Sequence, residues 1–224
     1  MSAPATARCG VVVLVSGRGS NLQAIIDATR AGTLPIDLRA VISNEPTAEA
    51  LGRARAAGIP THVIDHHAYP TRAAFDDALR ATIDRYAPDL VVLAGFMRLL
   101  GAGFIDHYAG RLLNIHPSLL PAFPGLRTHA RALAAGAATH GATVHFVTRE
   151  TDAGPIVIQA SVPVRRGDTP ETLAARVLKE EHRIYPLAIR WFAEGRLRLA
   201  GSQVLLDGAV RAEQGLETTP RRPE

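Results

Sequence analysis

Apolar runs and helical patterns alternate through the first half of the chain. Residues 10–15 form an apolar run rich in valine, and such a run is typical of a strand that is buried on both faces. A polar, glycine-rich turn follows over residues 16–21, and apolar residues then recur at helical spacing from Leu22 to Ala28. The chain is therefore predicted to begin with a strand, a turn and a helix.

This unit recurs downstream. The further segments with the same patterns are predicted strands at 36–42, 61–64 and 90–94 and predicted helices at 48–57 and 69–86. Apolar strands that alternate with helices are typical of a parallel sheet covered on two sides. We therefore expect an α/β fold with a Rossmann-like open sheet, mostly parallel in its N-terminal half and with antiparallel strands in its C-terminal half.

The antiparallel strands are expected because the alternation breaks in the second half of the chain. Residues 143–147 and 156–162 are two strand patterns with only a loop between them, and such a connection predicts antiparallel pairing. A long helical pattern then covers residues 170–194, with Asp168 or Thr169 as its cap.

The last predicted element is a hairpin over residues 197–206, broken by Gly201. From Asp207 onward, apolar residues thin out and charge rises. We expect residues 9–207 to form a single domain and residues 208–224 to form a mobile C-terminal tail.

Composition adds limits on location and partners. Of the 224 residues, 47% are hydrophobic and 21% are charged, as in a folded protein. The net charge is +4, but the basic residues form no stripe with interleaved aromatic residues, which disfavours nucleic-acid binding. A modest positive charge instead favours anionic small-molecule substrates. Residues 1–8 are too short for a signal peptide, and no apolar run reaches the roughly 18 residues that span a bilayer. A cytoplasmic protein without membrane contact is expected, with a homodimer as one alternative for its assembly.

Cysteine and histidine positions argue against a metal. Cys9 is the only cysteine, which excludes an internal disulfide and a cysteine-based zinc site. It opens an apolar run, so a buried and unreactive thiol is predicted. His66 and His67 are adjacent in a predicted loop, but no other residue stands at a metal-ligand spacing from them. No metal site is therefore predicted.

The segment 114–121, Asn-Ile-His-Pro-Ser-Leu-Leu-Pro, carries the strongest chemical signal. Side chains alternate faces in a strand, so Asn114 and His116 point the same way, and Pro117 pushes His116 towards an extended conformation. An amide that donates to an oxyanion and an imidazole that carries a proton are the two parts of an acyl-type transfer. The alternative is that both side chains only satisfy backbone groups at a strand end.

The turn at residues 17–21 lies between the first strand and the first helix. Its backbone N–H groups and the positive helix end suit a phosphate. A dinucleotide fingerprint would have a third glycine at Leu22 and an acid after the second strand, and the chain has neither. A nicotinamide cofactor is disfavoured, and a single phosphate held by Gly19, Ser20 and Asn21 fits better. A tight turn that only caps the helix is the alternative.

Asp152 lies between the two antiparallel strand patterns, among small and turn-forming residues. An aspartate in a turn usually bonds its own backbone, but a catalytic histidine often needs a carboxylate to orient it. Asp152 is therefore the best candidate partner for His116 if the hairpin folds back over the sheet edge. His145, in mid-strand, is expected to be a core or supporting histidine rather than a ligand.

An apolar segment follows the strand at 90–94, at the edge where open α/β sheets bind ligands. Residues 97–100 there are either ordinary packing or a lip for a flat aromatic ligand beside Asn114. Glu180 and Glu181 are typical of a solvated helix face, although one of them could bond a ribose.

Together these motifs resemble the family of folate-dependent formyltransferases, and within it the members that act on glycinamide ribonucleotide. The resemblance extends from Val11 to Asp207. Besides segment 114–121, it rests on residues 16–25, 93–98, 140–141, 144–147 and 181–182. Segment 114–121 marks the wider family, and the Gly-Ser-Asn loop with this chain length marks those members.

The resemblance implies transfer of the formyl group of 10-formyltetrahydrofolate to the amine of 5-phosphoribosylglycinamide in purine biosynthesis, with no metal and no nicotinamide cofactor. The implied catalytic residues are Asn114, His116 and Asp152. Those implied for the phosphoribosyl substrate are Gly19, Ser20, Asn21, Glu181 and Lys179. Those implied for folate are Arg72, Met97, Arg98, Leu99, Leu100, Asn114, Arg149, Glu150, Thr151 and Asp152. Thr143 and His145 would support the site from behind.

Two positions depart from the family pattern, and several alternatives stay open. Arg127 stands where relatives often carry histidine, and Thr143 where they often carry serine. A transfer-RNA formylating enzyme would carry a basic C-terminal domain, and a formyltetrahydrofolate hydrolase an N-terminal regulatory domain; we expect room for neither. A catalytically idle nucleotide-binding module would need the glycine loop but not the implied catalytic residues.

Overall fold

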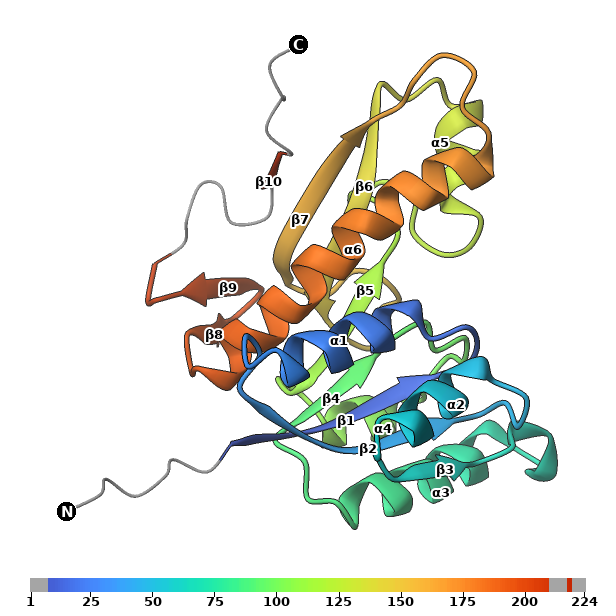
Figure 1. Cartoon of the computed structure of the whole chain (residues 1–224), viewed down its shortest axis with the longest axis vertical. Helices are drawn as coiled ribbons and strands as arrows, with labels where there is room; N and C mark the ends of the chain where they lie inside the picture. The colour runs from blue at the N-terminus through green and yellow to red at the C-terminus, as the bar shows by residue number, and fades with distance from the viewer. Residues whose placement is uncertain (1–7, 210–216, 219–224) are drawn as a thin grey trace.

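Eight strands form one twisted sheet in the computed structural model, which describes residues 8–209 and 217–218 (Figure 1). Their order is β10-β7-β6-β5-β4-β1-β2-β3. The strands that run parallel to one another are β1 (Cys9–Val15), β2 (Ile36–Ser43), β3 (Thr61–Val63), β4 (Leu90–Leu93) and β5 (Leu112–His116). The antiparallel additions are β6 (Thr139–Phe146) and β7 (Ile156–Pro163), and the short β10 (Glu217–Thr218) pairs in parallel with β7. A separate hairpin joins β8 (Leu197–Ala200) to β9 (Gln203–Leu206).

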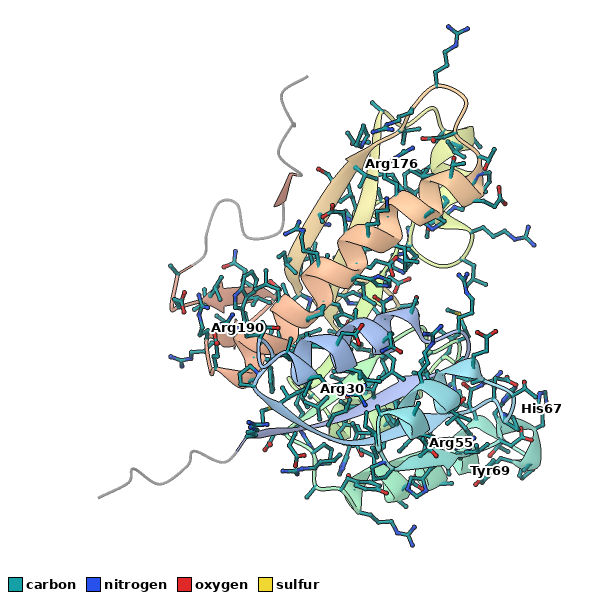
Figure 2. All side chains as sticks on the ribbon, viewed as in Figure 1. Arg30, Arg55, His67, Tyr69, Arg176 and Arg190 are labelled. Atoms are coloured by element: carbon teal, nitrogen blue, oxygen red, sulfur yellow. The ribbon has the colours of Figure 1, made fainter. Side chains whose placement is uncertain are left out.

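Helices cover both faces of this sheet (Figure 1), and side chains fill the space between the helices and the sheet (Figure 2). On one face lie α1 (Ser20–Arg30), α2 (Glu49–Ala56) and α6 (Pro170–Ala193), and on the other lie α3 (Arg72–Asp84) and α4 (Ala102–His107). Val11 and Val13 of β1 belong to the first core, whereas Val12 and Leu14 belong to the second. This division follows from the alternation of side chains along a strand, and it explains why β1 is apolar throughout.

The predicted α/β order is confirmed, including the antiparallel strands and the terminal hairpin. The sequence pattern does not predict three short helices, which are η1 (His66–Ala68), α4 and α5 (Thr128–Ala134). The helix expected from residue 69 begins at Arg72, because the Thr71 side chain caps it by accepting a hydrogen bond from the Ala74 N–H. The strand expected from residue 143 begins at Thr139, because this earlier stretch also pairs with β7.

The long helix begins at one of its predicted caps. Thr169 and Thr172 exchange side-chain to backbone hydrogen bonds, which forms a capping box. Most of the expected C-terminal tail lies outside the described residues. Within the described residues, the structure has no helix that is both long and apolar enough to cross a membrane.

Pairing between strands brings the candidate catalytic residues to one edge of the sheet. Asn114 lies beside Leu93 of β4 and opposite His145 of β6, while His116 lies opposite Thr143. The carboxyl ends of β1, β4 and β5 meet at this edge because the three strands are parallel. The fold therefore places the polar end of β5 next to the loops that follow β1 and β4.

Candidate active site

Asn114 is held in place by a buried histidine. Its side-chain nitrogen lies 3.2 Å from Nε2 of His145, and Nδ1 of His145 lies 3.0 Å from the Phe146 carbonyl oxygen. Burial lowers the pKa of His145, which favours the neutral ring. Nδ1 then donates to the carbonyl, and Nε2 accepts from Asn114. This arrangement fixes one N–H of the amide and leaves the second to donate elsewhere, and it places His145 directly against Asn114.

His116 lies between two oxygen acceptors. Its Nδ1 is 3.4 Å from Oδ2 of Asp152, and its Nε2 is 3.1 Å from the Phe123 carbonyl oxygen. The His116 side chain is only 7% exposed and that of Asp152 only 11% exposed, so water screens this ion pair weakly. Asp152 also lies 3.8 Å from Nε2 of His145 through its other oxygen. The structure therefore joins Asn114, His116 and Asp152 around one point.

The loop that carries Asp152 folds back over the sheet edge, as the sequence hypothesis requires. Asp152 adopts a left-handed backbone conformation with φ of 55°, which aspartate tolerates better than most residues. Its Oδ2 also accepts a hydrogen bond of 2.8 Å from the Gly125 N–H. A Cβ atom at Gly154 would lie 1.8 Å from the Phe146 carbonyl oxygen, so only glycine allows this close approach.

Hydrogen bonds from Thr143 hold the loop that follows His116 in place. Its hydroxyl donates to the Ser118 carbonyl at 2.6 Å and accepts from the Leu120 N–H at 3.0 Å. Gln159 on β7 donates to the same hydroxyl and to the Leu120 carbonyl, at 2.9 and 2.7 Å. Both Thr143 and Gln159 are buried. These bonds fix the segment 117–121 against β6 and thereby the position of His116.

Replacement of Thr143 by valine is expected to destabilise the fold. Valine keeps the shape but leaves the buried Leu120 N–H and Gln159 amide without this acceptor, which costs about 1–3 kcal/mol of unfolding free energy. Urea denaturation measures the change. Thr139→Val, at an exposed position on the same strand, is the matched control. Equal stability of both variants would contradict this account of the loop.

The glycine turn after β1 opens helix α1 with bare backbone N–H groups. Gly19 is the N-cap, with φ of 72° and no side-chain cap, and a Cβ there would lie 2.5 Å from the Cβ of Ala50. Glycine is therefore required both by conformation and by contact. Unfilled N–H groups at a helix start are a ready anion site. Ser20 and Asn21 supply the first of them.

The side chain of Asn21 has a partner that the sequence does not predict. It donates a hydrogen bond of 2.7 Å to Oε2 of Glu181 on α6, and both residues are buried. Any phosphate contact from Asn21 would therefore come from its backbone, while its side chain orients Glu181. Lys179 is exposed and lies two positions from Glu181 on α6, so the two side chains occupy different faces of that helix.

Glu181 should make stability depend on pH. Burial raises its pKa, only partly offset by the hydrogen bond from Asn21. A raised folded-state pKa means that the charged form opposes folding at high pH, and this cost disappears once the pH is low enough to protonate both states. Glu181→Gln removes the charge, and its amide can pair with the buried Oδ1 of Asn21, which has no partner among the described residues.

The expected result is a gain in unfolding free energy for Glu181→Gln that is larger at about pH 8 than at about pH 5. Urea denaturation at both pH values measures the gain. Glu180→Gln, on the neighbouring and less buried position, is the control. An equal or larger gain at the lower pH would show that the buried charge is not the cause.

Residues 97–100, called the apolar lip below, form a largely exposed segment after β4. Met97 and Leu99 are 68% and 64% exposed, Arg98 is also exposed and Leu100 is half-buried. The Met97 N–H donates to the Ser16 hydroxyl at 2.8 Å, which ties the lip to the end of β1. Large apolar side chains in solvent next to polar groups are typical of a ligand surface.

The remaining residues expected around folate are more scattered. Arg72 lines a separate cavity of about 460 Å³, together with Asp76 and Gly101. Arg149 pairs with Asp106 on α4, with 2.8 Å between Nε and Oδ1, so its guanidinium faces α4. Glu150 and Thr151 are exposed in the same loop as Asp152. The structure thus assembles the Asn114 cluster but does not bring Arg72 and Arg149 into it.

Several contributors to the site are not predicted from the sequence. Gln159 had a detectable signal, because it is a polar residue inside an apolar strand pattern. Phe123 and Gly125 act through backbone atoms, which residue type does not reveal.

Cys9 lies outside this site. It is half-buried, and burial raises the pKa of its thiol to about 11, which agrees with an unreactive side chain.

Comparison with known proteins agrees with this geometry. A family model described as formyl transferase matches residues 9–189. The chain is 55% identical to phosphoribosylglycinamide formyltransferase of Escherichia coli K12 over 205 residues, which is 92% of this chain and 97% of that one. It is 46% identical to the protein of the same name from Haemophilus influenzae, with the same coverage.

A solved structure gives the same result. The structure of phosphoribosylglycinamide formyltransferase from Coxiella burnetii, in complex with CHES, superposes with a TM-score of 0.90 and 54% identity. The match covers 95% of this chain and 100% of that one. Fold, sequence and strand-end geometry therefore agree, and the chain belongs to the formyl transferase family.

Proposed function

We propose that this enzyme transfers the formyl group of 10-formyltetrahydrofolate to the amine of 5-phosphoribosylglycinamide in purine biosynthesis. The products are the N-formyl amide and tetrahydrofolate. The observation that carries the proposal is the joint placement of Asn114, His116 and Asp152, with Nδ1 of His116 at 3.4 Å from Oδ2 of Asp152. The high identity to formyltransferases of that substrate supports it.

The proposed reaction is a formyl transfer through a tetrahedral intermediate. The amine attacks the formyl carbon, and a new carbon–nitrogen bond forms while the carbonyl oxygen gains negative charge. The second N–H of Asn114 donates to this oxygen. The protonated ring of His116 donates to it from Nδ1, because the 3.4 Å between Nδ1 and Oδ2 of Asp152 is longer than a usual N–H···O hydrogen bond, whereas Nε2 is bonded to the Phe123 carbonyl. Loss of a proton from the amine and delivery of a proton to N10 of the folate then accompany cleavage of the old carbon–nitrogen bond.

Asp152 supports this chemistry through His116. Its carboxylate lies beside Nδ1 of His116 in a buried setting, where it holds the ring plane and places a negative charge next to the ring. The Gly125 N–H restrains the carboxylate in turn. Proton movement between the substrate amine and the leaving nitrogen can therefore occur at a ring whose orientation is fixed.

The phosphoribosyl substrate is proposed to bind along α1 and α6. Backbone N–H groups of Gly19, Ser20 and Asn21 bind its phosphate, as the uncapped start of α1 allows. Glu181 accepts from the sugar hydroxyls, oriented by Asn21. Lys179 is the weaker phosphate candidate because it lies on another face of α6 from Glu181.

The folate is proposed to lie on the lip beside Asn114. Met97 and Leu99 contribute exposed apolar surface for its flat ring. The loop at residues 149–152 is proposed to enclose the reacting group from the other side. Arg72, at the start of α3, lines a separate cavity and is the weaker folate candidate. This arrangement directs the formyl carbon towards Asn114 and His116.

The test is an absorbance assay for folate release, with 5-phosphoribosylglycinamide as the acceptor. The proposal predicts turnover with 10-formyltetrahydrofolate and none when formate and ATP replace it. Turnover only with formate and ATP would overturn the folate assignment. Binding of the acceptor without turnover with either donor would support an idle nucleotide-binding module instead.

A further inference from the structure

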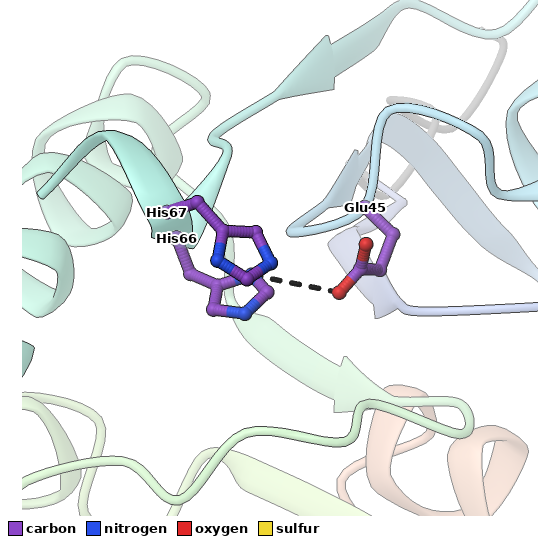
Figure 3. Close-up of side chains that lie close together, drawn as sticks. All are labelled: Glu45, His66 and His67. Atoms are coloured by element: carbon purple, nitrogen blue, oxygen red, sulfur yellow. Dashed lines mark ion pairs between the residues drawn. The ribbon is translucent and has the colours of Figure 1, made fainter.

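Glu45, His66 and His67 meet outside the proposed active site (Figure 3). Glu45 follows β2, whereas the two histidines belong to η1, the short helix after β3. Oε1 of Glu45 lies 3.5 Å from Nδ1 of His66, and one ligand atom from each of the three residues falls within 4.8 Å of the others. Two imidazoles and a carboxylate therefore converge on one small volume.

The distances match those around a bound metal ion. Zinc–nitrogen and zinc–oxygen bonds of about 2.0–2.2 Å place neighbouring ligand atoms roughly 3–3.5 Å apart. The 3.5 Å between Glu45 and His66 falls in that range, and so does the 3.1 Å between Nδ1 of His66 and the Asn44 carbonyl oxygen. His67 is exposed and Glu45 is half-buried, so small side-chain rotations can close the remaining gap.

The centre of this cluster is fixed by its surroundings. The His66 side chain is only 12% exposed, and its ring packs edge-on against Phe75, with centroids 6.4 Å apart. Asn44 is 1% exposed and bonds to the Ser16 hydroxyl through its side chain. The Asn44 amide nitrogen lies 3.2 Å from Oε1 of Glu45 and 3.3 Å from Nδ1 of His66, so it bridges these two atoms and must turn aside for an ion to bind both. His66, the Asn44 carbonyl and Glu45 are therefore largely in position before any ion binds.

The rings of His66 and His67 lie against each other, with centroids 3.9 Å apart. A metal ion can bind two neutral imidazoles that lie this close, with the carboxylate offsetting its charge. Imidazole and carboxylate together favour zinc and the neighbouring divalent transition metals over calcium or magnesium, which prefer oxygen.

We propose that Glu45, His66 and His67 form a binding site for a divalent transition-metal ion such as zinc, with the Asn44 carbonyl as a fourth ligand. This proposal departs from the expectation of no metal. Sequence spacing does not reveal the site because Glu45 and the histidines follow different strands, which β2–β3 pairing brings together.

The experiment measures zinc binding to the full-length protein, without a histidine tag, by titration calorimetry. We expect one saturable site, and a loss of affinity of at least about tenfold in each of Glu45→Gln, His66→Ala and His67→Ala. His107→Ala is the matched control, since His107 forms a simple surface pair with Asp84, at 3.0 Å, and should bind zinc like the unaltered protein.

Cobalt titration provides a second readout that reports on the ligands themselves. Bound cobalt should show visible absorption bands, whose intensity and position change when His67 is replaced. Two outcomes would overturn the proposal. One is the absence of saturable zinc binding to the unaltered protein. The other is unchanged affinity in the Glu45→Gln and His67→Ala variants, whose exposed or half-buried positions make misfolding an inadequate explanation.

Discussion

Replacement of His116 by alanine is expected to lower kcat by about 10²–10⁴-fold, the usual contribution of a positioned acid or base. The variant loses the charged donor to the oxyanion and the group that carries the proton between the two nitrogens. It also leaves Asp152 buried beside a cavity. Steady-state measurement of folate release at saturating donor and acceptor gives the change in kcat.

Two further variants separate chemistry from folding in this test. His116→Asn retains a polar group of similar size and should also be slow, since an amide cannot carry the proton. His107→Ala, on the exposed face of α4, should keep the normal rate. Thermal unfolding shows whether each variant is folded. A near-normal kcat in both His116 variants would refute the proposed mechanism.

Asp152→Asn is expected to lower kcat by at least about 10²-fold. Asparagine preserves the shape and can still accept from the Gly125 N–H, but it removes the negative charge beside Nδ1 of His116. The positive charge that the ring carries while it donates to the oxyanion then has no carboxylate beside it. The contacts of Asp152 are with His116, His145 and Gly125 rather than with the glycine turn at residues 17–21. KM for the phosphoribosyl substrate should therefore stay within about threefold.

The split between kcat and KM identifies the role of Asp152. Asp77→Asn, on a 71% exposed aspartate paired with Arg80 on α3, is the matched control and should change neither constant. If Asp152→Asn raised KM for the phosphoribosyl substrate by as large a factor as it lowered kcat, the role of the residue would be to shape the loop. A normal kcat would show that His116 does not depend on its carboxylate.

The sequence predicts the framework of the site because that framework follows from periodicity. The apolar run of β1, the glycine turn and the helix α1 are local patterns, and they specify where the uncapped N–H groups at the start of α1 lie. The spacing of Asn114 and His116 on β5 predicts that both reach the same region. Each of these inferences depends only on neighbours in the chain.

The distance from Asp152 to His116 could not be predicted in the same way. It depends on how sharply the β6–β7 connection folds back, which in turn depends on the contact between Gly154 and the Phe146 carbonyl. The support from the Phe123 and Gly125 backbone is also tertiary. The hydrogen bond between Asn21 and Glu181 joins residues that are 160 positions apart in the chain. The sequence predicts a ligand role for each of them, but it cannot reveal that their side chains pair.

The fate of the formyl carbon tests the central claim most directly. The purified protein is given 10-formyltetrahydrofolate labelled with carbon-13 in the formyl group, together with 5-phosphoribosylglycinamide, and the products are followed by nuclear magnetic resonance. The account predicts that the label appears in the new formamide on the glycinamide nitrogen, at a rate that collapses in His116→Ala. Label that appears as free formate, or in the formamide equally fast without His116, would contradict it.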